Sequence, residues 1–267
     1  MKQLIRQGFR RFGFDLVRFP PSPPDEMAAV RDLPPADLAL LTRVRPFTMT
    51  SVERMAALLD AVAYVSRSKI PGDIAECGVW RGGSMMLIAL ALLARGDTSR
   101  SLYLYDTFDG MPPPTSRDAN FAGEPARGLL EREPQRTGIW CYASREDVQA
   151  NLWSTGYPRE KIHFIKGKVE DTIPTSAPGQ LALLRLDTDW YESTRHELTH
   201  LYPLLPEGGV LVIDDYGHWQ GARKAVDEYF ERDPGAYLQR VDYTGRLLVK
   251  RHALTHDPVS NGRPLSP

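Results

Sequence analysis

The stretch D-I-A-E-C-G-V-W-R-G-G-S-M-M, from Asp73 to Met86, joins an apolar run to a helical pattern through a glycine-rich turn. The apolar run over residues 74–79 predicts a buried strand, and the pattern over residues 84–94 predicts a helix. Gly78 and the Gly82–Gly83 pair lie between them. A glycine turn between a strand and a helix is a common place for a bound ligand, because backbone N–H groups face it there. The stretch therefore predicts the first unit of an α/β fold and raises the question of its ligand.

Strands and helices continue to alternate along the rest of the chain. We expect further strands over residues 101–106, 161–167, 181–187 and 209–215, and helices over residues 52–65, 144–153, 192–205 and 221–230. Residues 237–251 predict two strands around a tight turn. This order is typical of a mostly parallel sheet with helices on both faces, in which the closing hairpin contributes one antiparallel strand.

Composition places the chain among ordinary globular proteins. Its 267 residues carry a formal net charge of -1, so nothing global points to a nucleic-acid partner. Cys77 and Cys141 are too few for a disulfide framework or a zinc site, and no apolar run reaches transmembrane length. Cytoplasmic location is the default expectation. The basic segment over residues 1–26 could lie on a membrane surface, but packing on its own domain or on a second subunit is favoured.

The chain divides into three predicted parts. Residues 1–49 form a helical, proline-rich extension, residues 50–251 form the α/β domain, and residues 252–267 form a polar tail. Within the domain, residues 107–142 are too long for a simple connection. We interpret them as a lid over the substrate, with a disordered insertion as the alternative.

Acidic residues follow five of the predicted strands. They are Glu76, Asp106, the Glu170–Asp171 pair, the Asp187 and Asp189 pair, and the Asp214–Asp215 pair, and no cluster of cations accompanies them. Ligands of open α/β sheets bind outside the carboxyl ends of the strands. This edge therefore predicts a site for hydroxyls, amines or metal ions rather than for free phosphates.

The glycine turn departs from both common nucleotide motifs. A Walker loop requires a lysine where Ser84 stands, and a dinucleotide fingerprint requires a glycine where Trp80 stands. Glu76 would repel a pyrophosphate but accept an ammonium group, and Asp106 suits the two hydroxyls of a ribose. An amine and a ribose together describe S-adenosylmethionine (SAM). The alternative is that Gly82–Gly83 only allows a helix and a strand to approach closely.

Asp187, Asp214 and Asp215 form a second constellation at the same edge. Three converging carboxylates repel one another unless a positive group lies between them. Mg²⁺ takes hard oxygen ligands and keeps several waters, so these aspartates predict a magnesium site. Solvated acids in loops are the alternative.

Four motifs in order carry a family resemblance. E-C-G-V-W-R-G-G-S, Y-D-T-F-D-G-M-P, L-D-T-D-W-Y-E-S-T and G-G-V-L-V-I-D-D-Y-G resemble the macrocin O-methyltransferase family, whose relatives include mycinamicin and novobiocin pathway enzymes. These are class I, SAM- and Mg²⁺-dependent enzymes that methylate sugar hydroxyls. The resemblance implies a Rossmann-like, seven-stranded sheet with an antiparallel last strand, and a homo-oligomer. It implies metal ligands at Asp187, Asp214 and Asp215. It implies cofactor contacts from Glu76, Cys77, Gly78, Gly83, Ser84, Asp106, Val169 and Asp171.

The expected reaction is transfer of the SAM methyl group to a hydroxyl of a small-molecule acceptor. Asp189 is the candidate base because strand geometry would place it on the same face as Asp187, and His218 is the second candidate. A catechol-type enzyme acting on a phenolic diol would use the same acids. A nucleotide-binding oxidoreductase or NTPase, and a non-catalytic SAM-binding protein, are further alternatives.

Overall fold

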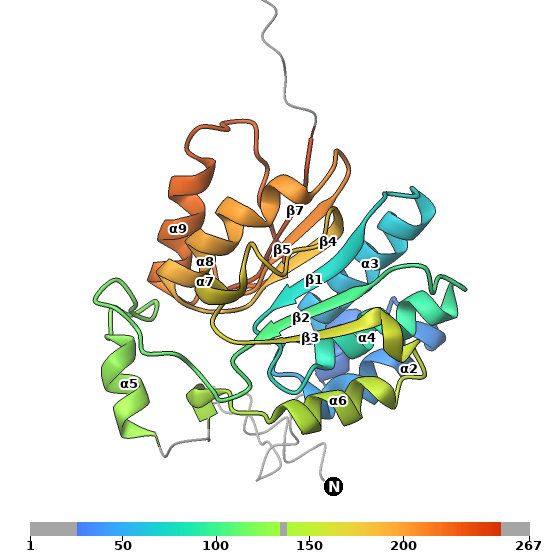
Figure 1. Cartoon of the computed structure of the whole chain (residues 1–267), viewed down its shortest axis with the longest axis horizontal. Helices are drawn as coiled ribbons and strands as arrows, with labels where there is room; N and C mark the ends of the chain where they lie inside the picture. The colour runs from blue at the N-terminus through green and yellow to red at the C-terminus, as the bar shows by residue number, and fades with distance from the viewer. Residues whose placement is uncertain (1–25, 134–137, 252–267) are drawn as a thin grey trace, which may run out of the picture.

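A computed structural model describes residues 26–133 and 138–251, and within them a seven-stranded sheet forms the centre of the fold (Figure 1). The spatial order of the strands is β3-β2-β1-β4-β5-β7-β6. Neighbouring strands from β3 to β5 are parallel, whereas β7 runs antiparallel to β5 and to β6. The predicted, mostly parallel sheet with its antiparallel closing strand is confirmed. The strands are β1 (Asp73–Cys77), β2 (Leu102–Asp106), β3 (Ile162–Lys166), β4 (Leu181–Leu186), β5 (Val210–Ile213), β6 (Gln239–Arg240) and β7 (Arg246–Val249).

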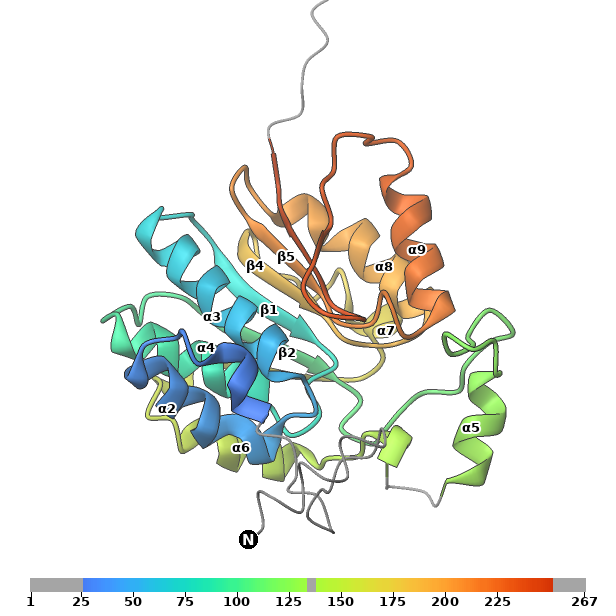
Figure 2. The same ribbon diagram turned by 180° about the vertical axis from the view of Figure 1, so that it is seen from behind.

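Helices cover both faces of the sheet, as predicted (Figures 1 and 2). One layer contains α2 (Pro35–Val44), α3 (Val52–Arg67), α4 (Gly83–Ala94) and α6 (Arg145–Trp153). The other contains α7 (Val169–Thr172), α8 (Tyr191–His200) and α9 (Gln220–Phe230). Each layer forms its own hydrophobic cluster with one face of the sheet, so the strands are packed between two hydrophobic cores.

The helix boundaries follow from local chemistry. Ser51 caps α3 by accepting a hydrogen bond from the Arg54 N–H at 3.2 Å, and Ser144 caps α6 by accepting one from the Asp147 N–H at 3.2 Å. Helix α4 is apolar on all sides because it lies between the sheet and three other helices, α2, α3 and α6. The N-terminus of α4 follows the glycine turn at the carboxyl end of β1.

The segment from residue 107 to residue 142 contains secondary structure of its own. Helix α5 (Ala126–Arg132) and a short 3₁₀ helix, Gly138–Trp140, belong to it. Together with Trp190 and Trp219, which follow β4 and β5, α5 forms a third hydrophobic cluster, and it lies outside the two helical layers. The described part of this segment is thus packed against the starts of α8 and α9, and its role as a lid stays a prediction.

Helix α2 belongs to the main core. Leu41 and Val44 are fully buried in the same cluster as α3, α4 and the sheet. The basic N-terminal segment up to residue 25 and the tail from residue 252 lie outside the described residues, and the division at residues 49 and 50 stays a prediction. Among the described residues, no helix has the length and apolar character needed to cross a membrane.

Replacing Leu41 by alanine tests whether α2 is an integral part of the domain. We expect the free energy of unfolding to fall by about 2–5 kcal/mol, because the substitution leaves a cavity in the core. Thr42→Ala, one position along on the exposed side of α2, is the control and should change it by less than ~0.5 kcal/mol. Urea unfolding of both variants provides the measurement. A loss of unfolding free energy in Leu41→Ala as small as that in the control would show that α2 does not contribute to the core.

Candidate active site

A cavity of about 390 Å³ opens at the carboxyl ends of β1, β2, β4 and β5. Most residues predicted for the site line it: Glu76, Gly78, Gly83, Ser84, Asp106, Val169, Asp187, Asp189, Asp214, Asp215 and His218. Cys77 and Asp171 lie outside its lining. Cys77 is buried in the hydrophobic core between the sheet and the layer formed by α7, α8 and α9. The fold therefore brings the two predicted constellations, the glycine turn and the aspartate cluster, into one cavity.

Gly78 allows the ends of β1 and β4 to meet. Its φ is +79°, and a Cβ atom at this position would overlap the carbonyl oxygen of Asp187. Gly83 allows a second close approach, because a Cβ there would lie 2.5 Å from the carbonyl oxygen of Phe47. Tight packing is thus one function of these glycines, and it brings the glycine turn against the Asp187 segment.

Asp106 holds the glycine turn from the next strand. Its Oδ2 accepts hydrogen bonds from the N–H groups of Val79 at 2.8 Å and Trp80 at 3.2 Å, and its Oδ1 accepts one from Phe108 at 2.7 Å. Burial raises the pKa of Asp106, and these N–H groups oppose that shift. The carboxylate that the sequence assigned to a ribose therefore also fixes the backbone of the turn.

Arg185, which the sequence analysis missed, connects the two constellations. It lies on β4 with 2% of its surface exposed. Its Nη1 donates to Glu76 and to Asp187 Oδ2 at 2.6 Å, and its Nη2 donates to Asp214 Oδ1 at 2.6 Å and to Thr50 Oγ1 at 2.9 Å. A charged residue inside the apolar run L-A-L-L-R-L was the signal, since an arginine is almost never fully buried without partners.

Arg54 supplies a second cation from α3. Its guanidinium forms ion pairs with Asp214 and, at 2.9 Å, with Asp242, whose Oδ2 also accepts a hydrogen bond from Ser51 Oγ at 2.8 Å. The strand ends were expected to lack a cluster of cations, and the two arginines reach the acids from other parts of the fold. The cations come from within a strand and from a helix, whereas the prediction considered only residues at strand ends.

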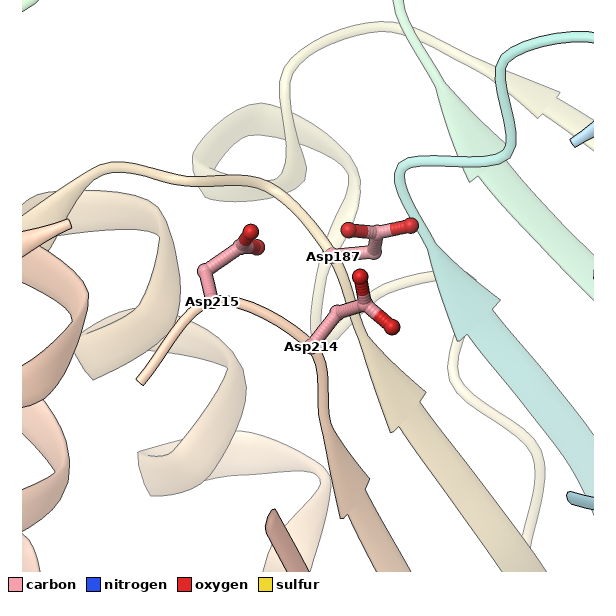
Figure 3. Close-up of side chains that lie close together, drawn as sticks. All are labelled: Asp187, Asp214 and Asp215. Carbon is pink, nitrogen blue, oxygen red and sulfur yellow. The ribbon is translucent and has the colours of Figure 1, made fainter. Parts of the chain in front are cut away.

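The three predicted metal ligands converge as expected (Figure 3). Asp187, Asp214 and Asp215 each offer a carboxylate oxygen, and these oxygens lie within 4.8 Å of one another. Burial raises the pKa of Asp187 to about 6, against the lowering effect of Arg185, and burial together with the Asp189 charge raises the pKa of Asp215 well above its ordinary value. The raised pKa values of Asp187 and Asp215 show that their charges are costly where they lie, and a cation between the carboxylates would stabilise the charged forms, so the donor set fits a hard divalent ion.

Asp189 reaches the cluster by a different route from the predicted one. Strand β4 ends at Leu186, and Asp189 has a φ of +68°, a left-handed conformation that costs a residue with a Cβ about 1–3 kcal/mol. Its carboxyl group lies beside those of Asp215 and Asp187 and near the Trp219 side chain, which all influence its pKa. Burial, followed by the charge of Asp187, raises its pKa to about 7. The candidate base therefore lies beside the cluster, although the extended geometry assumed for it does not continue.

His218 lies at the mouth of the cavity. Its Nδ1 is 3.2 Å from the hydroxyl of Tyr243, and its ring meets Phe121 edge-on at 5.5 Å between centroids. Burial, followed by the positive charge of Arg54, lowers its pKa, so the imidazole is neutral at neutral pH. Phe121 and Tyr243 are largely exposed, and they give this side of the mouth an aromatic surface.

Comparison with known proteins identifies the family. Residues 36–250 match the macrocin-O-methyltransferase (TylF) family. A relative from Streptomyces olivaceus, named 8-demethyl-8-(2,3-dimethoxy-alpha-L-rhamnosyl)-tetracenomycin-C 4'-O-methyltransferase, is 36% identical over 79% of this chain and 80% of its own length. A relative from Streptomyces niveus, named demethyldecarbamoylnovobiocin O-methyltransferase, is 35% identical over 68% of this chain and 67% of its own length.

A solved structure supports the same assignment. The O-methyltransferase NovP aligns with a TM-score of 0.68 and 32% identity over 77% of this chain and 83% of its own. The chain belongs to the macrocin O-methyltransferase family and is a class I O-methyltransferase.

Proposed function

We propose that the protein transfers a methyl group from SAM to a hydroxyl of a sugar or glycosylated natural product, with Mg²⁺ bound at the aspartate cluster. The observation that carries this proposal is the single cavity lined by both the glycine turn and the three aspartates. The name of the S. olivaceus relative contains a rhamnosyl group, which favours a sugar hydroxyl over a phenolic diol. Homo-oligomeric assembly and a cytoplasmic location stay predictions.

The glycine turn is the proposed site for the methionine end of SAM. Glu76 lines the cavity, and its Oε2 is buried without a hydrogen-bond partner among the described residues. Burial raises the pKa of Glu76 to about 8, although Arg185 opposes the shift. An ammonium group beside Oε2 would satisfy this oxygen and stabilise the ionised carboxylate. Gly78 and Ser84 would line the same end, with Asp106 and Val169 toward the nucleoside.

The aspartate cluster is the proposed metal site. Asp187, Asp214 and Asp215 would hold Mg²⁺, which when bound makes a coordinated hydroxyl more acidic and fixes its position. Asp187 and Asp214 already share Arg185, whereas Asp215 interacts with Asp189. Asp215 is therefore the ligand whose charge is least compensated by arginine.

Asp189 is the proposed proton acceptor. It lines the cavity beside Asp215, where an acceptor hydroxyl held by the cluster would lie within reach. His218 lies farther toward the mouth, among aromatic side chains, and we assign it to acceptor binding. Proton removal and methyl transfer would then occur on the same hydroxyl, with the methyl donor held by the glycine turn.

Ligand-dependent thermal stability tests the cofactor. S-adenosylhomocysteine (SAH) at 100 times its Kd should stabilise the protein by about 2.7 kcal/mol and raise Tm by roughly 5–10 °C. NAD and ATP, each with and without Mg²⁺, serve as controls and should leave Tm unchanged. Stabilisation by NAD or ATP but not by SAH would exclude a methyltransferase role for the cavity.

Asp215→Asn tests the metal site with little risk to the fold, because no arginine pairs with this carboxylate among the described ion pairs. Calorimetric titration with Mg²⁺ should show a loss of affinity of at least about tenfold. The control is Asp109→Asn, an exposed acid elsewhere in the chain, which should bind Mg²⁺ like the wild type. Unchanged affinity in Asp215→Asn would remove Asp215 from the ligand set.

Separate substitution of the two candidate bases tests the proton acceptor. With a rhamnosylated acceptor and saturating SAM and Mg²⁺, Asp189→Asn should lower kcat about 10²–10⁴-fold, since it removes general-base catalysis. His218→Gln should act mainly on the KM of the acceptor. The reverse ranking would assign the base to His218, and wild-type kcat in both variants would exclude both residues.

A further inference from the structure

Asp118 is a buried carboxylate in the middle of the segment from residue 107 to residue 142. Only 1% of its surface is exposed, although its neighbours Ser116 and Arg117 are exposed. Its Oδ2 accepts hydrogen bonds from the N–H and Oγ1 of Thr115, at 2.7 and 2.9 Å. Its Oδ1 accepts one from the N–H of Tyr191 at 2.8 Å. One oxygen therefore organises the segment itself, and the other joins it to a distant helix.

The joined helix is α8, and Tyr191 is its first residue. Trp190, at the N-cap position, makes no side-chain capping hydrogen bond. Asp118 supplies the missing acceptor, and its negative charge suits the positive end of the helix dipole. Tyr191 lies two residues beyond Asp189, so this contact fixes the far end of the turn that contains Asp187 and Asp189.

The same carboxylate lies against α9. A Cβ atom at Gly221 would overlap Asp118 Oδ1 and would lie 3.0 Å from the Tyr191 nitrogen. The next residue of the segment, Ala119, accepts a backbone hydrogen bond from Gln220 at 2.8 Å. Asp118 thus lies where α8 and α9 begin. Asp187 precedes α8 in the chain, and Asp214 and Asp215 precede α9.

Two tryptophans extend this junction to the cluster. Trp190 and Trp219 meet edge-to-face with 4.9 Å between their centroids. Trp190 Nε1 donates to the carbonyl oxygen of Pro112 at 2.9 Å, and the Trp219 side chain lies close enough to Asp189 to lower the pKa of that carboxyl group. Contacts of the segment therefore reach Asp189 through Trp219 as well as through the backbone at Tyr191.

We propose that Asp118 is a positioning residue for the aspartate cluster: by binding the Tyr191 N–H at the Gly221 junction, it holds the turn that contains Asp187 and Asp189, so that Asp187 stays in place as a metal ligand. This inference rests on the proposed function, and it gives the segment a role in assembling the metal site. Groups that orient metal ligands typically contribute 10–100-fold to metal affinity.

Calorimetric titration of the full chain with Mg²⁺ alone, together with SAH titration and Tm, tests the proposal. Asp118→Ala removes the hydrogen bond to the Tyr191 N–H. Gly221→Ala adds a Cβ atom on α9 that pushes Asp118 Oδ1 away from Tyr191. Both should weaken Mg²⁺ binding at least about tenfold and leave SAH affinity within about twofold, since the glycine turn is untouched. Gly221→Ala keeps the Asp118 carboxylate in the chain and disturbs only its contact with Tyr191, so it is the second variant for the case that Asp118→Ala fails to fold.

Two matched controls separate positioning from general stability. Thr115→Val removes a hydroxyl that binds Asp118 and leaves the Tyr191 contact in place. Gly128→Ala adds a Cβ in α5, where the nearest atom is 3.8 Å away. Both controls should bind Mg²⁺ like the wild type.

Wild-type Mg²⁺ affinity in the folded Gly221→Ala and Asp118→Ala variants, even with a lowered Tm, would overturn the proposal and leave the proposed function standing. A wild-type chain that binds neither Mg²⁺ nor SAH would overturn the proposed function and this inference with it.

Discussion

The ion-pair arrangement around Arg185 is the constraint on which the site depends. In the sheet, β4 lies between β1 and β5, so a guanidinium on β4 can reach acids at the ends of both neighbours. Burying Glu76, Asp187 and Asp214 together without a countercharge would carry a large desolvation and repulsion cost, and a buried ion pair that loses one partner costs about 3–5 kcal/mol. Arg185 therefore allows the proposed cofactor end and the proposed metal end of the cavity to be adjacent.

The charges are compensated unequally across the cluster. Arg185 and Arg54 both pair with Asp214, and Arg185 also pairs with Asp187, whereas among the described residues no ion pair involves Asp215, whose neighbour Asp189 is another acid. The excess negative charge consequently lies on the Asp189 and Asp215 side. A divalent cation is attracted most strongly to carboxylates that no arginine neutralises. The positions of Arg54 and Arg185 therefore determine which side of the cluster attracts such an ion most strongly.

The sequence predicted the features that depend on local pattern and on the geometry of parallel sheets. Apolar runs located the strands, and the acids that follow them had to meet at one edge. Side-chain partners over long sequence distances were not predictable in the same way. Asp106 binds the backbone of the glycine turn, and Arg54 reaches Asp214 from a helix 160 residues away. The positive φ of Asp189 was also missed, because a short polar loop gives no period from which to infer a conformation.

The turn from Asp187 to Tyr191 shows how the enzyme can maintain a strained residue at its site. The left-handed conformation of Asp189 costs about 1–3 kcal/mol. Within the turn, Thr188 donates a hydrogen bond to the fully buried Glu197 of α8 at 2.9 Å. At the end of the turn, Tyr191 donates its N–H to Asp118. Hydrogen bonds that involve a charged group contribute about 1.5–3 kcal/mol each and neutral ones about 0.5–1.5 kcal/mol. These two contacts together are sufficient to offset the strain, and they come from α8 and from the 107–142 segment. The conformation of this turn is therefore a property of the assembled domain rather than of its own residues.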